Sequence, residues 1–306
     1  MAAPTLINIG THNLALYAHG PQPEDSSSPV VVFVSGIASS ALNWAVVLRG
    51  LPQNLRAYTY DRSGNRHSDP SPNSPTAETI AEELELLLKK AAITNPLILV
   101  GHSWAGVLIS EYIVRAGINQ IAGVVLVDAN HETAPLVLNV NDPVLQGLFK
   151  GVEPYKGMGI ESENLMTAEE WDLFRADEAT DKSKAIAIAE ENEYQASFVT
   201  LRKKGLPAKQ PILDTKPVFV IGGTRSRDWQ NMYNNSVARG NGTEEERAHA
   251  REMIRTADKK NESLMKEFLK LSTTSKLVVA HKSGHFVQLT EPGIVVDGVK
   301  WVLENL

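Results

Sequence analysis

A serine flanked by small residues offers the clearest nucleophile in the chain. Residues 101–106 read Gly-His-Ser-Trp-Ala-Gly, which puts a glycine two residues before Ser103 and an alanine two residues after it. Four apolar residues suited to a buried parallel strand, 97–100, come just before, and a helical pattern starts at residue 107. A strand that turns so abruptly into a helix exposes the serine hydroxyl beside the helix N-terminus. The spacing therefore predicts a nucleophile elbow at Ser103.

Such a serine needs help from two other groups. A hydroxyl is a weak nucleophile at neutral pH, so it requires a base within hydrogen-bonding distance and a carboxylate that orients the base. Among the eight histidines, His285 has the best context, because it follows a strand pattern, lies in a Ser-Gly-His-Phe turn and precedes a closing helix. We therefore predict that His285 accepts the proton of Ser103.

The surrounding sequence alternates between strand and helix patterns. Buried strands are predicted from apolar runs at residues 30–34, 55–60, 97–100 and 121–127, with helical patterns between them. This alternation is typical of a parallel sheet with right-handed crossovers. Ligand sites lie at the carboxyl ends of such strands, so the loop at residues 35–40 should face the same crevice as Ser103.

A polar loop at residues 61–69 follows the second of these strands. Charged and turn-forming residues at a strand end more often stabilise a turn than take part in chemistry. We therefore interpret this loop as a turn held by an ion pair between Asp61 and Arg62.

The alternation stops between residues 129 and 210. Loop-like residues to about 159 lead to a capping box at Thr167 and Glu170, after which a long helical pattern continues to about residue 205. A mostly helical insertion beside the crevice is well placed to act as a lid. Its aromatic residues are candidates for lining the substrate pocket, although each can equally belong to a small core of the lid itself. These residues are Trp171, Phe174, Tyr194 and Phe198.

Composition argues against several other functions. The net charge of −6 and the lack of a basic stripe make a nucleic-acid partner unexpected. The absence of cysteine rules out thiolate catalysis and Cys-ligated zinc, and no histidine spacing suits another metal. No phosphate-binding glycine loop follows a strand, so we expect no cofactor. Without a secretion signal or an apolar stretch of membrane-spanning length, a soluble cytoplasmic protein with no membrane insertion is expected.

Taken in order, the motifs resemble those of the α/β-hydrolase superfamily. The matching runs are residues 34–37 (Val-Ser-Gly-Ile), 61–64 (Asp-Arg-Ser-Gly), 101–106, 283–286 (Ser-Gly-His-Phe) and 291–292 (Glu-Pro). The resemblance implies an α/β-hydrolase fold, with a mostly parallel central sheet flanked by helices and a mainly helical lid inserted after the sixth strand. The core would comprise residues 1–128 and 211–306, and the lid residues 129–210.

The resemblance also implies an oxyanion hole, with one departure from the family pattern. Ser35 occupies the place where the family usually has histidine in a His-Gly pair. The expected donors are two backbone N–H groups, that of Ile37, two residues after Ser35, and that of Trp104. Because both are backbone groups, the hole should survive the replacement of the histidine.

The sequence indicates the acid that orients His285 less directly than it indicates the serine and the histidine. Most relatives carry it two to four residues after the seventh strand, where this chain has Thr224 and Arg225, and Asp228 lies further on, 57 residues before His285. The haloalkane dehalogenases, which the chain also resembles, place the acid at the end of the sixth strand, where Asp128 stands. We favour Asp128 over Asp228, although many relatives have a noncatalytic aspartate at that point. Glu132 is a distant third.

These expectations define a function and its rivals. The favoured function is a serine hydrolase that cleaves an ester, lactone or thioester bond of a largely apolar small molecule through an acyl-enzyme on Ser103. A serine at this position argues against epoxide hydrolase or dehalogenase chemistry, for which the resemblance would require aspartate. One alternative is nonhydrolytic chemistry, such as cyclisation, dehydration, lyase chemistry or acyl transfer. The other is a ligand-binding protein with a weak triad.

Overall fold

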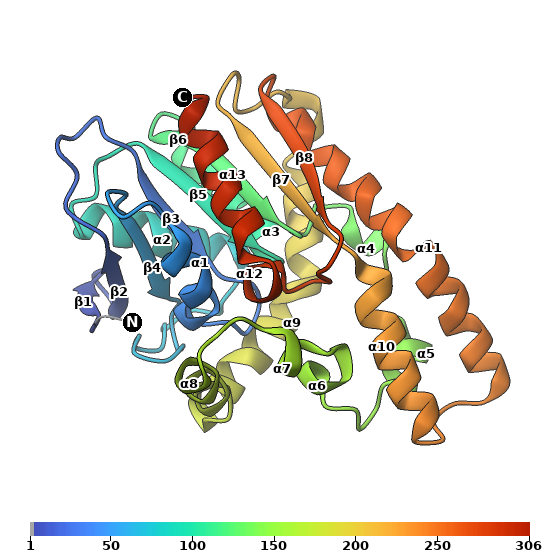
Figure 1. Ribbon diagram of the computed structural model, residues 1–306. Helices are drawn as coiled ribbons and strands as arrows, with labels where there is room; N and C mark the ends of the chain where they lie inside the picture. The colour runs from blue at the N-terminus through green and yellow to red at the C-terminus, as the bar shows by residue number, and fades with distance from the viewer. Residues whose placement is uncertain (1–2) are drawn as a thin grey trace.

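The computed structural model describes residues 3–306, and its centre is one eight-stranded sheet. The strand order is β1-β2-β4-β3-β5-β6-β7-β8. The strands are β1 (Thr5–Asn8), β2 (Asn13–His19), β3 (Val30–Val34), β4 (Ala57–Asp61), β5 (Leu97–His102), β6 (Ile121–Val127), β7 (Val218–Gly223) and β8 (Ser275–Ala280). β1 with β2 and β2 with β4 are antiparallel pairs, and all other neighbours are parallel. The sheet is therefore mostly parallel, as predicted (Figure 1).

Helices cover both faces of this sheet. Alternate residues of a strand point to opposite faces, so Val32 and Leu99 pack in the same core as residues of α2, α3 and α11, whereas Phe33 and Val100 pack with α1 and α13. These helices are α1 (Ala45–Gly50), α2 (Ala77–Lys90), α3 (Ala105–Ala116), α11 (Glu244–Phe268) and α13 (Pro292–Glu304). The inner strands β3 and β5 are buried on both sides, which explains their continuous apolar runs.

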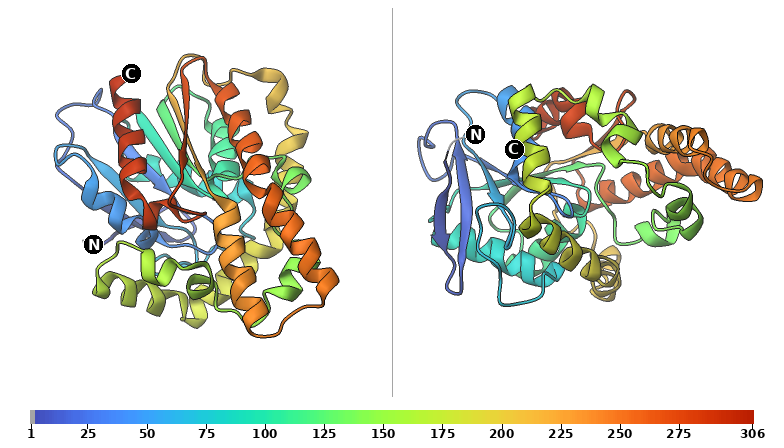
Figure 2. Two further views of the ribbon diagram at one scale, coloured as in Figure 1. Left: turned by 45° about the vertical axis from the view of Figure 1, so that its right-hand side comes forward. Right: turned by 90° about the horizontal axis from the view of Figure 1, so that it is seen from below.

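The segment between β6 and β7 interrupts the alternation; its middle part lies beyond one end of the sheet, and its last residues return toward the start of β7 (Figure 2). It contains α4 (Ala134–Val137), α5 (Pro143–Leu148), α6 (Pro154–Met158), α7 (Ile160–Glu163), α8 (Ala168–Glu178), α9 (Asp181–Lys203) and a 3₁₀ turn at Leu206–Lys209. The predicted capping box at Thr167 is present at the start of α8.

The loop expected before residue 159 is instead a set of short helices. Asp142 caps α5 and Glu153 caps α6, and in each case a proline occupies the first helical position. Pro143 and Pro154, which lie among these loop-like residues, are therefore helix starts.

Two further helices project beyond the sheet. α10 (Arg225–Ala238) begins directly after β7, and α11 returns antiparallel to it from a capping box at Thr243 (Figure 1). A short helix, α12 (Val287–Thr290), precedes α13, and 3₁₀ turns cover Ala41–Trp44 and Leu269–Leu271. No helix within residues 3–306 is long and apolar enough to cross a membrane.

Candidate active site

Ser103 lies on the sharp connection between β5 and α3. Its backbone has φ +58°, in the left-handed region that most residues avoid, as a nucleophile elbow requires. The turn is closely packed: a Cβ at Gly101 would lie 2.5 Å from Cδ1 of Ile109, and one at Gly106 would lie 2.5 Å from the carbonyl oxygen of Asn130. Glycine is therefore required on both sides of the serine.

The structure brings Ser103, His285 and Asp128 together. His285 Nε2 lies 2.9 Å from Ser103 Oγ, and His285 Nδ1 lies 2.7 Å from Asp128 Oδ2. The three side chains come from the ends of β5 and β6 and from the loop after β8. This is the serine, imidazole and carboxylate order in which a base can take the serine proton while the acid fixes the ring.

Asp128 is fully buried and surrounded by donors. Its Oδ1 accepts hydrogen bonds from the backbone N–H of Gly223 (2.9 Å) and from Asn261 Nδ2 (2.7 Å), and Arg225 Nε lies 2.8 Å from Oδ2. Burial raises the pKa of Asp128, but the Arg225 cation and the hydrogen bonds from His285 and Asn261 outweigh it and leave the pKa well below its usual value. The carboxylate is therefore ionised at neutral pH.

The other candidate acids occupy different positions. Asp228 Oδ2 accepts a hydrogen bond from the backbone N–H of His285 (2.7 Å), so it holds the loop rather than the imidazole. The contact is tight, since a Cβ at Gly284 would lie 1.8 Å from Asp228 Oδ1. Burial raises the pKa of Asp228 to about 6. No hydrogen bond joins Glu132 to His285; Arg202 donates to the Glu132 carbonyl oxygen instead.

A second histidine, His102, contacts His285. His102 Nε2 donates to the carbonyl oxygen of His285 (2.9 Å), and the ring centroids are 4.5 Å apart. Burial lowers the pKa of His102 well below its usual value. Burial also lowers the pKa of His285, with a smaller contribution from Arg225, while Asp128 acts in the opposite direction. Both rings are therefore neutral near pH 7, the state that a general base requires.

The expected oxyanion donors lie beside the serine. Ile37 lines the same cavity as Ser103, and a Cβ at Gly36 would be 3.0 Å from Cβ of Ser103, so this backbone passes very near the nucleophile. Trp104 directly follows the serine. Within residues 3–306, neither the Ile37 nor the Trp104 backbone N–H donates to a protein acceptor. Two backbone donors are thus available for a developing oxyanion.

The loop that carries Ile37 is held by an ion pair that the sequence did not suggest. Arg62 pairs with Glu190 of α9, not with Asp61, and it also donates to the carbonyl oxygens of Ser35 (2.7 Å) and Gly36 (2.6 Å). Glu190 in turn accepts from the backbone N–H of Ala38 (2.7 Å). The expected ion pair between Asp61 and Arg62 is therefore wrong.

Asp61 has other partners. Its carboxylate accepts hydrogen bonds from the hydroxyl of Tyr17 (2.6 Å) and from the backbone N–H of Ala41 (3.0 Å). Neighbours in sequence at a strand end point to opposite sides, so each charge finds a partner from a distant segment.

A cavity of about 650 Å³ opens over Ser103 and His285. Its remaining lining is mostly polar and comes from the insertion and from the ends of β3, β6 and β7: Ile37, Asn130, Val140, Asn141, Gln146, Glu191, Asn192, Tyr194 and Arg225. This volume suits a small-molecule ligand.

Of the four aromatic residues suggested for the pocket, only Tyr194 lines this cavity. Its hydroxyl donates to Asn130 Oδ1 (3.0 Å). Phe198 packs edge-on behind it, with ring centroids 4.9 Å apart. Trp171 and Phe174 stack on each other, 5.5 Å between centroids, and belong to a small aromatic cluster with Tyr155. Trp171 and Phe174 therefore pack within the insertion, and Phe198 packs in the main core beside the sheet; none of the three lines the cavity.

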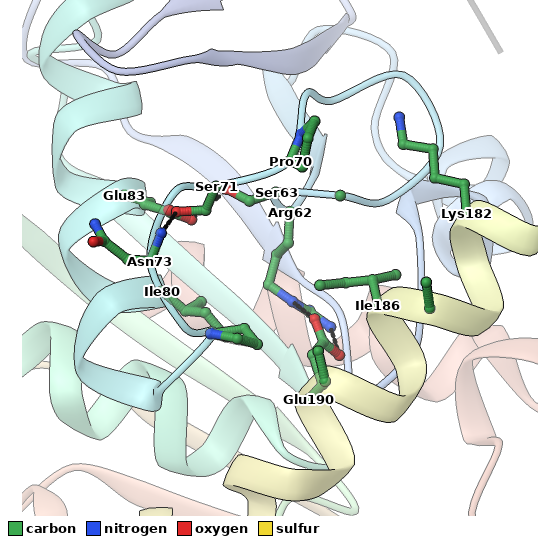
Figure 3. Close-up of a pocket in the computed structure, with 14 residues that line it drawn as sticks. Arg62, Ser63, Pro70, Ser71, Asn73, Ile80, Glu83, Lys182, Ile186 and Glu190 are labelled. Carbon is green, nitrogen blue, oxygen red and sulfur yellow. Dashed lines mark hydrogen bonds and ion pairs between the residues drawn. The ribbon is translucent and has the colours of Figure 1, made fainter.

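A second cavity, of about 470 Å³, is lined in part by the Arg62–Glu190 pair (Figure 3). Its lining is largely apolar and includes Ile80 and Ile186, with the buried carboxylate of Glu83 at one side. Arg62 and Glu190 thus line this space and also bind Gly36 and Ala38, on either side of Ile37.

Sequence reasoning missed several residues of the site. The sequence did contain a signal that Arg225 belongs to the site, because this residue occupies the place where most relatives of the superfamily have the acid. Glu190 and Asn261 lie within long helices, where an acidic or amide residue ordinarily indicates a solvated face. Only the fold shows that these two positions are buried.

Comparison with known proteins places this geometry in a family. The chain is 32% identical over 306 residues to a probable transporter, efuK, of Hormonema carpetanum, matching 98% of this chain but only 42% of the relative's length. It is 28% identical over 300 residues to an AB hydrolase superfamily protein of Gibberella zeae, covering 95% of this chain and 91% of the relative.

A solved structure extends the comparison. A thermophilic esterase from Thermogutta terrifontis superposes with a TM-score of 0.60 at 16% identity and covers 99% of this chain and 98% of the esterase, which is a likeness of fold. Residues 31–297 match the family model described as the alpha/beta hydrolase family. The chain is therefore a member of the alpha/beta hydrolase family.

Proposed function

We propose that this protein is a serine hydrolase that cleaves an ester, lactone or thioester bond of a small molecule through an acyl-enzyme on Ser103. The observation that carries the proposal is the continuous contact from Ser103 Oγ through the His285 imidazole to the Asp128 carboxylate, at 2.9 and 2.7 Å. Membership of the alpha/beta hydrolase family supports it.

The geometry supports a two-step mechanism. His285 Nε2 takes the proton of Ser103 as Oγ attacks the carbonyl carbon, while Asp128 holds Nδ1–H and stabilises the imidazolium. The N–H groups of Ile37 and Trp104 receive the oxyanion. His285 then returns the proton to the leaving alcohol or thiol, and a water molecule activated by the same ring releases the acyl group.

The insertion takes part in binding under this proposal. Val140, Asn141 and Gln146, together with Glu191, Asn192 and Tyr194 of α9, line the cavity above Ser103, which supports a lid role for residues 129–210. The lining of this cavity also changes the expected substrate. Amide and charged side chains predominate where an apolar wall was anticipated, which favours a substrate with polar substituents.

A burst experiment with 4-nitrophenyl butyrate tests the proposal. The wild type should release one equivalent of 4-nitrophenol rapidly before steady turnover, because acylation of Ser103 precedes slower deacylation. Ser103→Ala should show neither phase, and intact mass spectrometry of the quenched wild type should show a butyryl adduct that maps to Ser103.

The same proteins and substrate distinguish the serine hydrolase function from its alternatives. If the wild type shows neither burst nor adduct and Ser103→Ala behaves identically, the serine hydrolase proposal fails. Turnover in H₂¹⁸O separates hydrolysis from acyl transfer, since hydrolysis puts one solvent oxygen into the released acid and transfer to another acceptor does not.

A further inference from the structure

Arg225 is the most unusual charged residue in the cavity. It is the first residue of α10, directly after β7, and only 8% of its surface is exposed. It lines the same cavity as Ser103 and His285. A buried cation beside a nucleophile calls for an account of every hydrogen-bond donor that it carries.

Most of these donors have no partner in the protein. Arg225 Nε lies 2.8 Å from Asp128 Oδ2, but at an angle that forms no hydrogen bond. Within residues 3–306, Nη1 and Nη2 have no hydrogen-bond acceptor either. Of the three nitrogens, Nε is the one that is buried without a partner, and an unsatisfied buried donor is costly, more so in a charged group. The guanidinium therefore holds donors ready for an acceptor that enters the cavity.

Arg62 provides an internal comparison. It is as deeply buried, at 3% exposure, but its Nε, Nη1 and Nη2 all donate to Glu190 or to the backbone carbonyl oxygens of Ser35 and Gly36. A purely structural buried arginine in this protein is thus fully satisfied by protein acceptors. Arg225 differs because its donors face a cavity of about 650 Å³.

The charge of Arg225 is only partly neutralised by Asp128. That carboxylate already accepts hydrogen bonds from His285, Gly223 and Asn261, so its negative charge is shared among several donors. The other carboxylate lining the cavity, Glu191, is exposed. The planar fork of a guanidinium matches a carboxylate with two parallel hydrogen bonds.

We propose that Arg225 binds a free carboxylate of the substrate through Nη1 and Nη2, so that the preferred substrates are half-esters, or lactones and thioesters that carry a carboxylate on the acyl side. This inference rests on the proposed hydrolase function for its reaction. The carboxylate anchors the acyl chain while the scissile carbonyl lies over Ser103, and the amide side chains of the cavity accommodate polar groups between the two.

Paired substrates of similar size test this preference. We expect kcat/KM for monoethyl glutarate to exceed that for ethyl pentanoate by about 30-fold or more, with ethanol release followed by NMR. Monoethyl succinate and monoethyl adipate set the chain length that spans from Arg225 to Ser103. Because Arg225 also lies against Asp128, its substitution will slow both substrates, and the measured quantity is therefore the ratio of the two kcat/KM values.

Arg225→Gln should bring that ratio to near one, and Arg225→Lys should restore only part of it, because an ammonium group lacks the planar fork. Arg227→Gln is the matched control. It lies two residues further along α10, pairs with Glu163 and Asp228 and does not line the cavity, so the rates of both substrates can change but their ratio should stay at the wild-type value.

A binding measurement keeps the inference independent of turnover. Calorimetric titration with glutarate should give saturable binding to the wild type and to Ser103→Ala, with a Kd raised about 30-fold or more in Arg225→Gln. Dimethyl glutarate should bind all three weakly.

The two proposals fail in different ways. If ethyl pentanoate is hydrolysed through Ser103 but half-esters have no advantage and Arg225→Gln leaves the ratio unchanged, the carboxylate preference is overturned and the hydrolase function stands. If glutarate binds in an Arg225-dependent manner but no ester acylates Ser103, the hydrolase function is overturned and the carboxylate site stands.

Discussion

At the scale of single residues, two buried aspartates contact the same histidine in different ways. Asp128 reaches the imidazole Nδ1, whereas Asp228 reaches the backbone N–H. Only the first contact can fix the tautomer of the ring and stabilise its positive charge during the reaction. The second fixes where the loop lies.

Matched amide substitutions separate these roles. Asp128→Asn should lower kcat by about 10⁴-fold, the loss found when a triad carboxylate becomes an amide, because the wrong tautomer of His285 is then favoured. Asp228→Asn should retain kcat within a few-fold, since the amide oxygen can still accept from the His285 N–H. Steady-state kinetics with 4-nitrophenyl butyrate measures both, and a comparable loss in Asp228→Asn would contradict the assignment.

Ser103, His285 and Asp128, which the structure brings together, could all be proposed from the sequence because their signals are local. Ser103 stands between small residues at a strand end, and His285 and Asp128 each follow a strand of their own. Arg225 and Glu190 act through partners far away in sequence, and the side chain of Glu190 gave no sign that its helix face is buried. Their roles depend on packing that no local pattern encodes.

At the scale of elements, α9 and the loop after β3 are joined by one buried ion pair. Arg62 holds two carbonyl oxygens of that loop, and Glu190 holds the N–H of Ala38, adjacent to the proposed oxyanion donor. The position of Ile37 therefore depends on the insertion being docked against the sheet. In the proposed function, this coupling joins the cavity-lining insertion to the chemical step.

Substitutions in the pair should separate stability from rate. Glu190→Gln leaves the buried Arg62 cation without its counter-charge and should cost about 3–5 kcal/mol of unfolding free energy. The double variant Arg62→Met with Glu190→Met should recover much of that stability, because no uncompensated charge remains. Its kcat should nevertheless stay low, by up to about 10²–10³-fold, because the loop has lost its anchors and one oxyanion donor is displaced.

Urea unfolding and ester kinetics on the same preparations measure the two effects. Ile188→Ala, at an exposed position of α9, is the control and should change neither quantity. A double variant that regains both stability and wild-type kcat would show that the ion pair does not position the loop.

At the scale of the whole molecule, the two aspartates act on stability in opposite directions with pH. The pKa of Asp228 is raised to about 6 in the folded protein, above the value of about 3.9 for an unfolded chain. Its favourable contribution is fully present below the unfolded pKa and is lost as the pH rises through about 6. The depressed pKa of Asp128 gives a contribution that is present above its unfolded pKa and is lost as the pH falls below it.

Asp228→Asn should isolate the first effect. As the pH rises from 4.5 to 7.5, the variant should gain about 2 kcal/mol of stability relative to the wild type, since it has no carboxylate to ionise in the core. Urea unfolding at both pH values gives the difference directly. A stability difference that is independent of pH would mean that Asp228 ionises as readily in the folded protein as in the unfolded chain.

The arrangement of the three catalytic candidates along the chain also has a meaning for folding. Ser103 and Asp128 end neighbouring strands, β5 and β6, that are joined by a single crossover helix, whereas His285 stands 157 residues beyond Asp128 and reaches it only from the edge strand β8. Contacts of such long sequence separation require much larger loops to close than those between adjacent strands. Recovery of the proposed esterase activity during refolding should therefore report the docking of β8 and its loop, and Ser103 and Asp128 can already face each other before that activity returns.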